Sequence, residues 1–96
     1  MMAGIVEPDI HNPEAGKIYY HYHIDDKYVE HSRGVYYGLQ IGDFISPSWL
    51  GRGIYKVLNL VDRKDLPLSN NGYIREIHIR LVNDEEYKFL EDNQYL

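Results

Sequence analysis

The sequence predicts a mainly β (β+α) fold: a small antiparallel β-barrel or strongly bent sheet with one short C-terminal α-helix. Three observations predict it. Apolar and polar side chains alternate with period two in several short segments, as in strands that bury one face. No helical periodicity lies between these segments, which excludes a doubly wound parallel sheet. A single helix-start signal occurs, at Asn83.

The chain has 96 residues, which fits one domain with one core. We divide it into an extended N-terminal arm at 1–16, which contains Pro8 and Pro13, and a single β-barrel-type domain at 17–96. The chain contains no cysteine, which excludes disulfides, thiolate zinc ligands and cysteine nucleophiles. Without a secretory signal pattern or an apolar run of about 18 residues, we expect a cytoplasmic protein.

Residues 17–25 form the first expected strand, because Ile18, Tyr20, Tyr22 and Ile24 fall on one face. The chain then turns at 25–27, and residues 28–31 form a short partner strand. Tyrosine favours such strands, and 10 of the 13 aromatic residues are tyrosine, so this tyrosine-rich chain suits half-buried sheet faces and contact surfaces.

A short strand is expected between Gly38 and residue 45, where two glycines indicate a bulge or bend. The segment Ile41-Gly42-Asp43-Phe44-Ile45 resembles the hydrophobic–Gly–Asp–hydrophobic entry to a strand of SH3-like small barrels. The resemblance implies an SH3-like barrel. Residues 46–53 follow as a loop, since Pro47 cannot donate to a sheet and two glycines allow positive φ.

Residues 54–62 carry apolar side chains on both faces, so we expect a central strand that is covered twice. An Asn-Gly turn signal at 71–72 precedes a strand at 73–82, with Ile77, Ile79 and Leu81 inward and antiparallel to the 54–62 strand.

The expected helix spans 84–93. Asn83 can cap its first turn, and Glu86 completes a capping-box pattern. Tyr87 and Leu90 share one face and are expected to dock on the sheet, with Phe89 at its edge.

The sequence contains no recognisable catalytic motif around its serines, so we predict that the protein is not an enzyme and needs no cofactor. Trp, Tyr and Arg dominate interface hot spots, and Trp49 lies in a Pro/Gly-flanked loop beside Arg52. We therefore predict a small binding module that engages a protein partner through this loop and acidic flanks such as Asp25, Asp26 and Glu30. The predicted partner-binding residues are Trp49, Arg52, Tyr36, Tyr37, Tyr55 and Tyr73. An accessory inhibitor encoded by a phage or mobile element is one form that such a module takes, and pairing of sheet edges predicts a homodimer as one arrangement.

The first alternative is nucleic-acid binding. The net charge is −5, but residues 51–82 carry +3 between two acidic ends. Cations and interleaved tyrosines in this segment would track phosphates and stack on bases. Its residues are Arg52, Lys56, Arg63, Lys64, Arg75 and Arg80.

A distant alternative is a metal site at His21 and His23, two apart on one strand face, with Asp25. The His-x-His pair resembles the start of the cupin metal motif. That motif has Glu three or four residues after the second His, where this chain has Asp25 and Asp26 close by and Glu30 further on. The resemblance implies a metal ion held by the two imidazoles.

Overall fold

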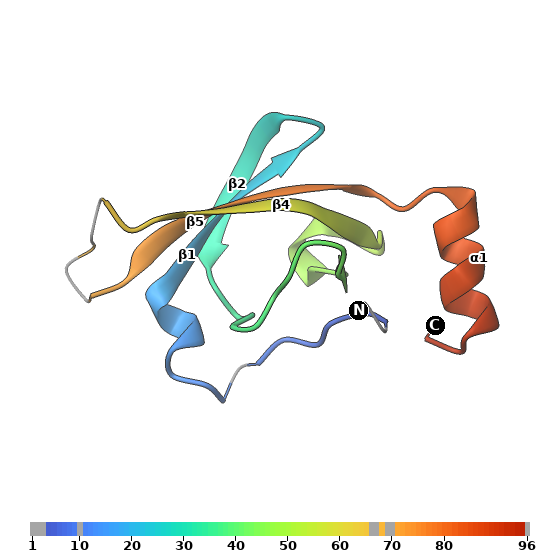
Figure 1. Cartoon of the computed structure of the whole chain (residues 1–96), viewed down its shortest axis with the longest axis horizontal. Helices are drawn as coiled ribbons and strands as arrows, with labels where there is room; N and C mark the ends of the chain where they lie inside the picture. The colour runs from blue at the N-terminus through green and yellow to red at the C-terminus, as the bar shows by residue number, and fades with distance from the viewer. Residues whose placement is uncertain (1–3, 10, 66–67, 69–70, 96) are drawn as a thin grey trace.

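The protein is a strongly bent five-stranded sheet with one C-terminal helix (Figure 1). The computed structural model describes residues 4–9, 11–65, 68 and 71–95. Its strands are β1 (Ile18–Ile24), β2 (Lys27–Arg33), β3 (Phe44–Ile45), β4 (Tyr55–Arg63) and β5 (Tyr73–Leu81). Two short 3-10 helices, η1 (Ala15–Lys17) and η2 (Ser48–Leu50), and the helix α1 (Asp84–Asp92) complete the fold. The sheet curls into a half-barrel, which confirms the predicted fold class.

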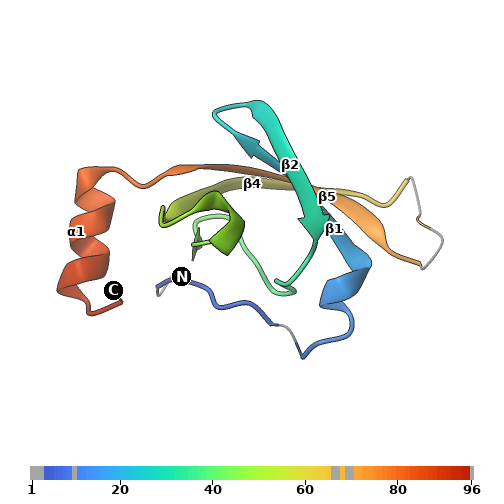
Figure 2. The same ribbon diagram turned by 180° about the vertical axis from the view of Figure 1, so that it is seen from behind.

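The sheet is mixed, with the strand order β2-β1-β5-β4-β3. Neighbouring strands are antiparallel, as predicted, at β1–β2, β4–β5 and β3–β4, but β1 and β5 run parallel. The parallel pair arises because the segment 34–43 carries the chain from β2 to the opposite edge of the sheet, where β3 begins (Figures 1 and 2). Residue alternation contains no information on strand direction, so this pairing could not be predicted.

The main core fills the concave face of the sheet. The predicted inward face of β1 is confirmed, since Ile18, Tyr20 and Tyr22 are at most 1% exposed. Val57 from β4 and two isoleucines from β5 pack beside them. The 34–45 segment covers this core through Tyr36, Leu39 and Ile45.

The convex face of the sheet is uncovered. Leu58 and Val61 of β4 are each 43% exposed. The expectation that 54–62 is covered on both faces is therefore wrong. Leu81 lies opposite Tyr55, on the same face as Ile77 and Ile79, as expected, but it is at the end of β5 and is 57% exposed. Helix α1 lies beyond the end of β5 instead of on this face (Figure 1).

The capping box at the start of α1 is confirmed: the Asn83 side chain accepts from the Glu86 N–H, and Glu86 accepts from the Asn83 N–H. Leu90 is fully buried against Phe44 and Ile54 in a second, smaller core. Tyr87 is 48% exposed, so the expectation that it docks on the sheet is wrong. The helix reaches only the β3 end of the molecule, where Leu90 is its buried residue.

The N-terminal arm is held by main-chain hydrogen bonds to two separate segments. The Val6 N–H donates to the Phe44 carbonyl (2.7 Å), and the Asp9 N–H donates to the Val35 carbonyl (2.5 Å). The expected strand after Gly38 shortens to Phe44–Ile45, because Gly42 turns the chain at φ +96°. Part of the predicted turn at 70–72 lies outside the described residues. Within the described part of the chain, no helix is long and apolar enough to span a bilayer.

Candidate functional site

A mostly apolar groove of about 450 Å³ lies between the N-terminal arm, the end of β2 and the 46–49 loop. We call it the Trp49 groove. The arm contributes Glu7 and Pro8 to one wall, and the loop contributes Pro47 and Trp49 to another. The residues that line the groove include Glu7, Pro8, Tyr22, Tyr36, Pro47 and Trp49.

The backbone of the loop fixes the position of Trp49. Pro47 holds an extended conformation (φ −62°, ψ 129°) ahead of η2, and Gly51 ends the turn at φ +85°, which favours glycine. The Trp49 ring packs edge-on against Tyr22, with ring centroids 4.8 Å apart and an interplanar angle of 72°. This geometry is typical of a stable aromatic pair. The Trp49 side chain is nevertheless 41% exposed, so part of its ring surface faces solvent.

Tyr22 and Tyr36 form the buried base of the groove. Tyr22 is 1% exposed and Tyr36 is 3% exposed. Burial raises the pKa of both phenols, that of Tyr36 to about 12, so both hydroxyls stay protonated at neutral pH. The groove therefore has hydroxyl groups that can act as hydrogen-bond donors next to an indole ring.

The Tyr36 hydroxyl belongs to a residue that lines the groove. It makes no hydrogen bond to any described residue, whereas the neighbouring Tyr20 hydroxyl donates to the Tyr36 carbonyl (2.9 Å). Every fully buried side-chain polar atom of the described residues has a hydrogen-bond partner. The Tyr36 hydroxyl is therefore not fully buried, and Tyr36 lines this groove.

The six predicted partner-binding residues do not form one surface. Trp49 and Tyr36 line the groove, but Arg52 is exposed in the same loop without lining it. Tyr55 is only 8% exposed and belongs to the core. Tyr37 is half-exposed outside the groove, and Tyr73 accepts a hydrogen bond from Arg75 (3.3 Å).

Sequence reasoning missed the groove residues Glu7, Pro8, Tyr22 and Pro47. Tyr22 was expected on the buried strand face, where it lies, and no sequence pattern showed that the loop would pack on its ring. The arm has no periodicity, so its contribution to a wall was not predictable either.

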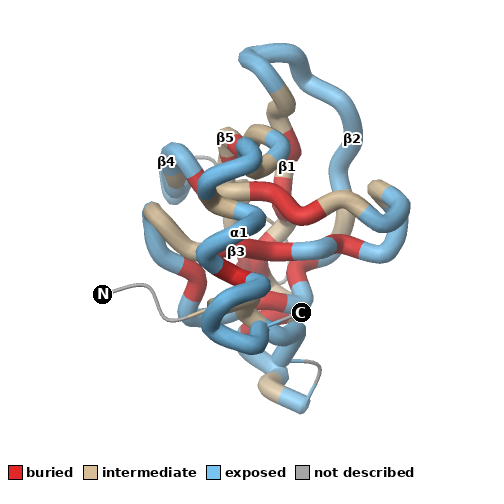
Figure 3. The backbone as a smooth tube through the Cα atoms, turned by 90° about the vertical axis from the view of Figure 1, so that its right-hand side faces the viewer, coloured by how far each residue is buried: buried red, intermediate tan, exposed pale blue. Residues whose placement is uncertain are grey.

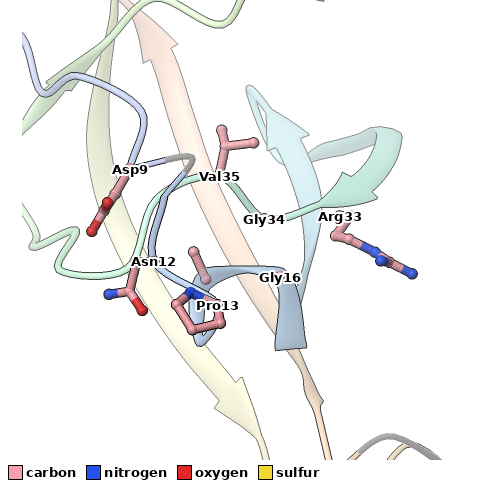
Figure 4. Close-up of a pocket in the computed structure, with 8 residues that line it drawn as sticks. Asp9, Asn12, Pro13, Gly16, Arg33, Gly34 and Val35 are labelled. Atoms are coloured by element: carbon pink, nitrogen blue, oxygen red, sulfur yellow. The ribbon is translucent and has the colours of Figure 1, made fainter.

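A second hollow of about 300 Å³ adjoins the groove and is lined by Asp9, Asn12, Pro13 and Gly16 among others (Figure 4). Arg33 and Val35 line both hollows. In Figure 4 the Arg33 side chain extends away from Asp9 and Asn12. Its guanidinium donates to the Tyr19 hydroxyl (2.9 Å) and lies over the Tyr19 ring (5.5 Å), so Arg33 is already engaged outside the groove.

Most of the predicted nucleic-acid-binding cations are paired with carboxylates. Glu86 binds both Arg80 (2.7 Å) and Lys56 (3.3 Å). Asp62 accepts two hydrogen bonds from Arg75 (2.6 and 3.1 Å), and Arg63 pairs with Asp65 (3.4 Å). Lys64 lies 4.9 Å from the centroid of the Tyr73 ring, and Arg52 makes none of these contacts. The basic segment is thus largely neutralised by its own neighbours.

The histidines lie on the convex face. His23 Nε2 is 2.5 Å from one oxygen of Glu76, and His21 Nδ1 is 3.7 Å from the other. The His23 and His78 rings stack at 4.6 Å. Asp25 lies in the β1–β2 turn at φ +52°. Among the residues that the structure describes, no three His, Asp or Glu side chains are arranged to hold a metal ion.

The fold and the groove define a small, mainly β protein with an aromatic surface hollow. Figure 3 shows the buried residues inside the molecule and the mostly exposed helix and β1–β2 hairpin. No protein-family model matches the chain, and comparison with curated proteins and with solved structures gives no significant match.

Proposed function

We propose that this chain is a non-catalytic binding module that engages a protein partner through the Trp49 groove. The observation that carries the proposal is the position of Trp49, which is 41% exposed and forms one wall of an apolar groove. Aromatic residues that are partly exposed next to apolar hollows are typical anchors of protein interfaces. Among the described residues that line the groove, no serine hydroxyl is hydrogen-bonded to Glu7 or to a histidine, which favours binding over chemistry.

The distribution of charge favours a protein partner over nucleic acid. A nucleic-acid surface needs cations that are free to neutralise phosphates. Here Lys56, Arg75 and Arg80 are occupied by carboxylates, and the whole chain carries a net charge of −5. Nucleic-acid binding through the 52–80 segment is the alternative. Fluorescence polarisation with single- and double-stranded oligonucleotides at two salt concentrations tests it, since salt-sensitive binding at low salt would support that alternative.

Peptide display tests the protein-binding proposal. A random peptide library is selected on the wild-type protein, and each enriched peptide is then measured against Trp49→Ala and Leu58→Ala. Leu58 is a matched control because it is 43% exposed but lies on the uncovered face. We expect enriched peptides to bind wild type and Leu58→Ala equally and Trp49→Ala at least ten-fold more weakly. Failure to enrich any peptide, or equal binding to Trp49→Ala, would contradict the proposal.

Two further expectations accompany it. A module without cysteine suits a reducing compartment, so we place it in the cytoplasm. Strand β2 forms an open edge of the sheet, so a second copy could pair there, and sedimentation velocity over a concentration series would detect such a dimer.

A further inference from the structure

We infer that the convex face of the sheet is a second docking surface, which takes a carboxylate-rich segment of a partner protein only when its histidines are protonated, below about pH 6. This surface lies outside the Trp49 groove, so the inference goes beyond the proposed function. We call it the histidine face. It contains four of the five histidines of the chain: His21, His23, His31 and His78.

Cross-strand pairing brings these four histidines together. His21 of β1 is paired with His31 of β2, and His23 of β1 is paired with His78 of β5. Directly paired residues project to the same face of a sheet. The His21 and His31 ring centroids are 5.8 Å apart, and the His23 and His78 rings stack at 4.6 Å with an interplanar angle of 15°. Three strands therefore place four imidazoles in one patch.

The patch is accessible to a partner. The His31 side chain is 61% exposed and the His78 side chain is 30% exposed. The next strand, β4, contributes Val61, which is paired with Glu76 and is exposed beside the rings. A docked segment can therefore contact imidazoles and an aliphatic side chain at once.

Carboxylates at neutral pH make this patch negative. Those that contact the rings are Glu76, 2.5 Å from His23 and 3.7 Å from His21, Asp26, 3.8 Å from His78, and Glu30, 3.8 Å from His31. Asp25 adds a further carboxylate in the adjoining β1–β2 turn. An acidic segment is repelled by this arrangement as long as the imidazoles are neutral.

Protonation reverses the sign of the patch. Histidine gains its positive charge between about pH 8 and pH 5, so acidification adds four positive charges here. Arg33 lies beside them over the Tyr19 ring and is positive throughout this range. At the other end of the face, Glu86 pairs with two cations, Lys56 and Arg80. The other neighbour of the rings, the Tyr28 hydroxyl, is bound to His31 Nδ1 (2.9 Å) and is uncharged. The imidazolium ions and Arg33 thus outnumber the carboxylates.

The chemistry of the face favours an acidic peptide over nucleic acid. Phosphate backbones are held by lysine and arginine, which are charged at every physiological pH, whereas most cations of this face are histidines. Exposed Leu58 and Val61 of β4 border the patch and suit the apolar side chains of a peptide. We therefore commit to a protein segment that combines carboxylates with aliphatic residues.

The test is fluorescence anisotropy with the full chain and a labelled octapeptide of six aspartates and two leucines. Aspartate is ionised at pH 5.5 and at pH 7.5, so the charge of the peptide stays constant. We expect at least ten-fold tighter binding at pH 5.5, from several exposed charge pairs, and weaker binding as salt is raised. A peptide with asparagine at every aspartate position should not bind. A labelled oligothymidylate is measured beside it at both pH values.

Variants test whether these histidines cause the pH effect. His31→Gln and His78→Gln each remove one charge, and we expect each to reduce the pH effect about two-fold and the double variant about four-fold. His11→Gln is the matched control, because His11 is the fifth histidine and is exposed on the N-terminal arm. We expect it to keep the wild-type pH effect. Circular dichroism at both pH values checks that each variant is folded.

A measurement on the wild type locates the peptide without substitutions. In two-dimensional NMR spectra at pH 5.5, we expect the peptide to shift the backbone amide signals of His21, His31 and His78 and to leave the Trp49 indole signal in place. This pattern separates the histidine face from the Trp49 groove.

Four results would overturn the inference: equal peptide affinity at the two pH values, an equal loss of the pH effect in His11→Gln and His78→Gln, shifts confined to Trp49, or unfolding of the wild type at pH 5.5. Tighter binding of oligothymidylate than of the aspartate peptide would also overturn it, because the partner would then be nucleic acid. The Trp49 groove is tested separately by peptide display, so the proposed function stands or fails independently of these results.

Discussion

Replacing Glu86 with glutamine should detach helix α1 from the sheet more than any other single surface change. Glu86 accepts from both terminal nitrogens of Arg80 (2.7 and 2.9 Å) and lies 3.3 Å from the Lys56 amine. It also accepts from the Asn83 N–H (2.9 Å) at the start of the helix. One carboxylate thus links α1 to both β4 and β5.

The size of the effect follows from the pKa of Glu86. The Arg80 hydrogen bonds lower this pKa to about 2, with smaller contributions from Asn83 and Lys56. A shift of this size corresponds to an upper limit of about 3 kcal/mol at neutral pH. Solvent screens the pair because the Arg80 and Lys56 side chains are about one-third exposed. We therefore expect Glu86→Gln to lower the free energy of unfolding by about 1–2 kcal/mol, or the melting temperature by roughly 4–15 °C.

The effect must depend on pH in a defined direction. Because the folded-state pKa is lowered, the stabilisation is complete above the ordinary glutamate pKa and is lost as pH falls towards 2. Urea unfolding followed by circular dichroism at pH 7, 4 and 2.5 measures it. The stability gap between wild type and Glu86→Gln should shrink at each step.

Glu85→Gln is the matched control. Glu85 lies in the same first turn and has the same interaction with the helix dipole, but it makes no ion pair with a described residue. We expect Glu85→Gln to lower the free energy of unfolding by less than about 0.5 kcal/mol. An equal loss in both variants, or a gap for Glu86→Gln that stays constant down to pH 2.5, would refute the role of the Arg80–Glu86–Lys56 bridge.

Three further predictions concern packing. Gly34→Ala would place a Cβ atom 2.6 Å from the Tyr20 ring, so we expect urea unfolding to show a free energy of unfolding lower by about 1–3 kcal/mol. Gly38→Ala is the control, because its Cβ atom would meet nothing within 4 Å, and it should change the free energy of unfolding by less than about 0.5 kcal/mol. Leu90→Ala empties a fully buried site and should cost about 2–5 kcal/mol in the same assay. Val61→Ala, at 43% exposure on the convex face opposite Glu76, should be nearly neutral, and a large loss there would contradict the assignment of the convex face as uncovered.

Local patterns predicted the elements of this fold because each is specified within a few residues. The alternation along 17–25 identified β1 and its buried face, and the spacing of Asn83 and Glu86 identified the start of α1. The faces of β4 were not predictable, because the register shifts between Val57 and Asn59. Odd-numbered residues such as Val57 point inward before this bulge, and Leu60 packs against the core after it. A single inserted residue therefore makes one half-buried strand resemble a strand that is covered twice.

The site was less predictable than the fold because its residues meet through long-range packing. Trp49 was identified from its residue type and its loop context. The ring that it packs against, Tyr22, is 27 positions away, and the alternation of its strand places it in the core. The same is true of the arm, whose Glu7 carries no local signal. Whether a residue forms the wall or the base of a groove depends on which distant segments pack beside it, and residue alternation does not predict that packing.

The arm connects folding and binding in this protein. Its hydrogen bonds go to Phe44 at the start of β3 and to Val35 in the crossing segment, and Glu7 lies between these two attachment points. The wall of the Trp49 groove therefore depends on these two contacts and on the packing of Ile5 and Val6 against the two cores. A perturbation that loosens either contact would weaken binding without touching Trp49. Loss of binding in a variant is thus evidence for the groove only when the arm remains in place.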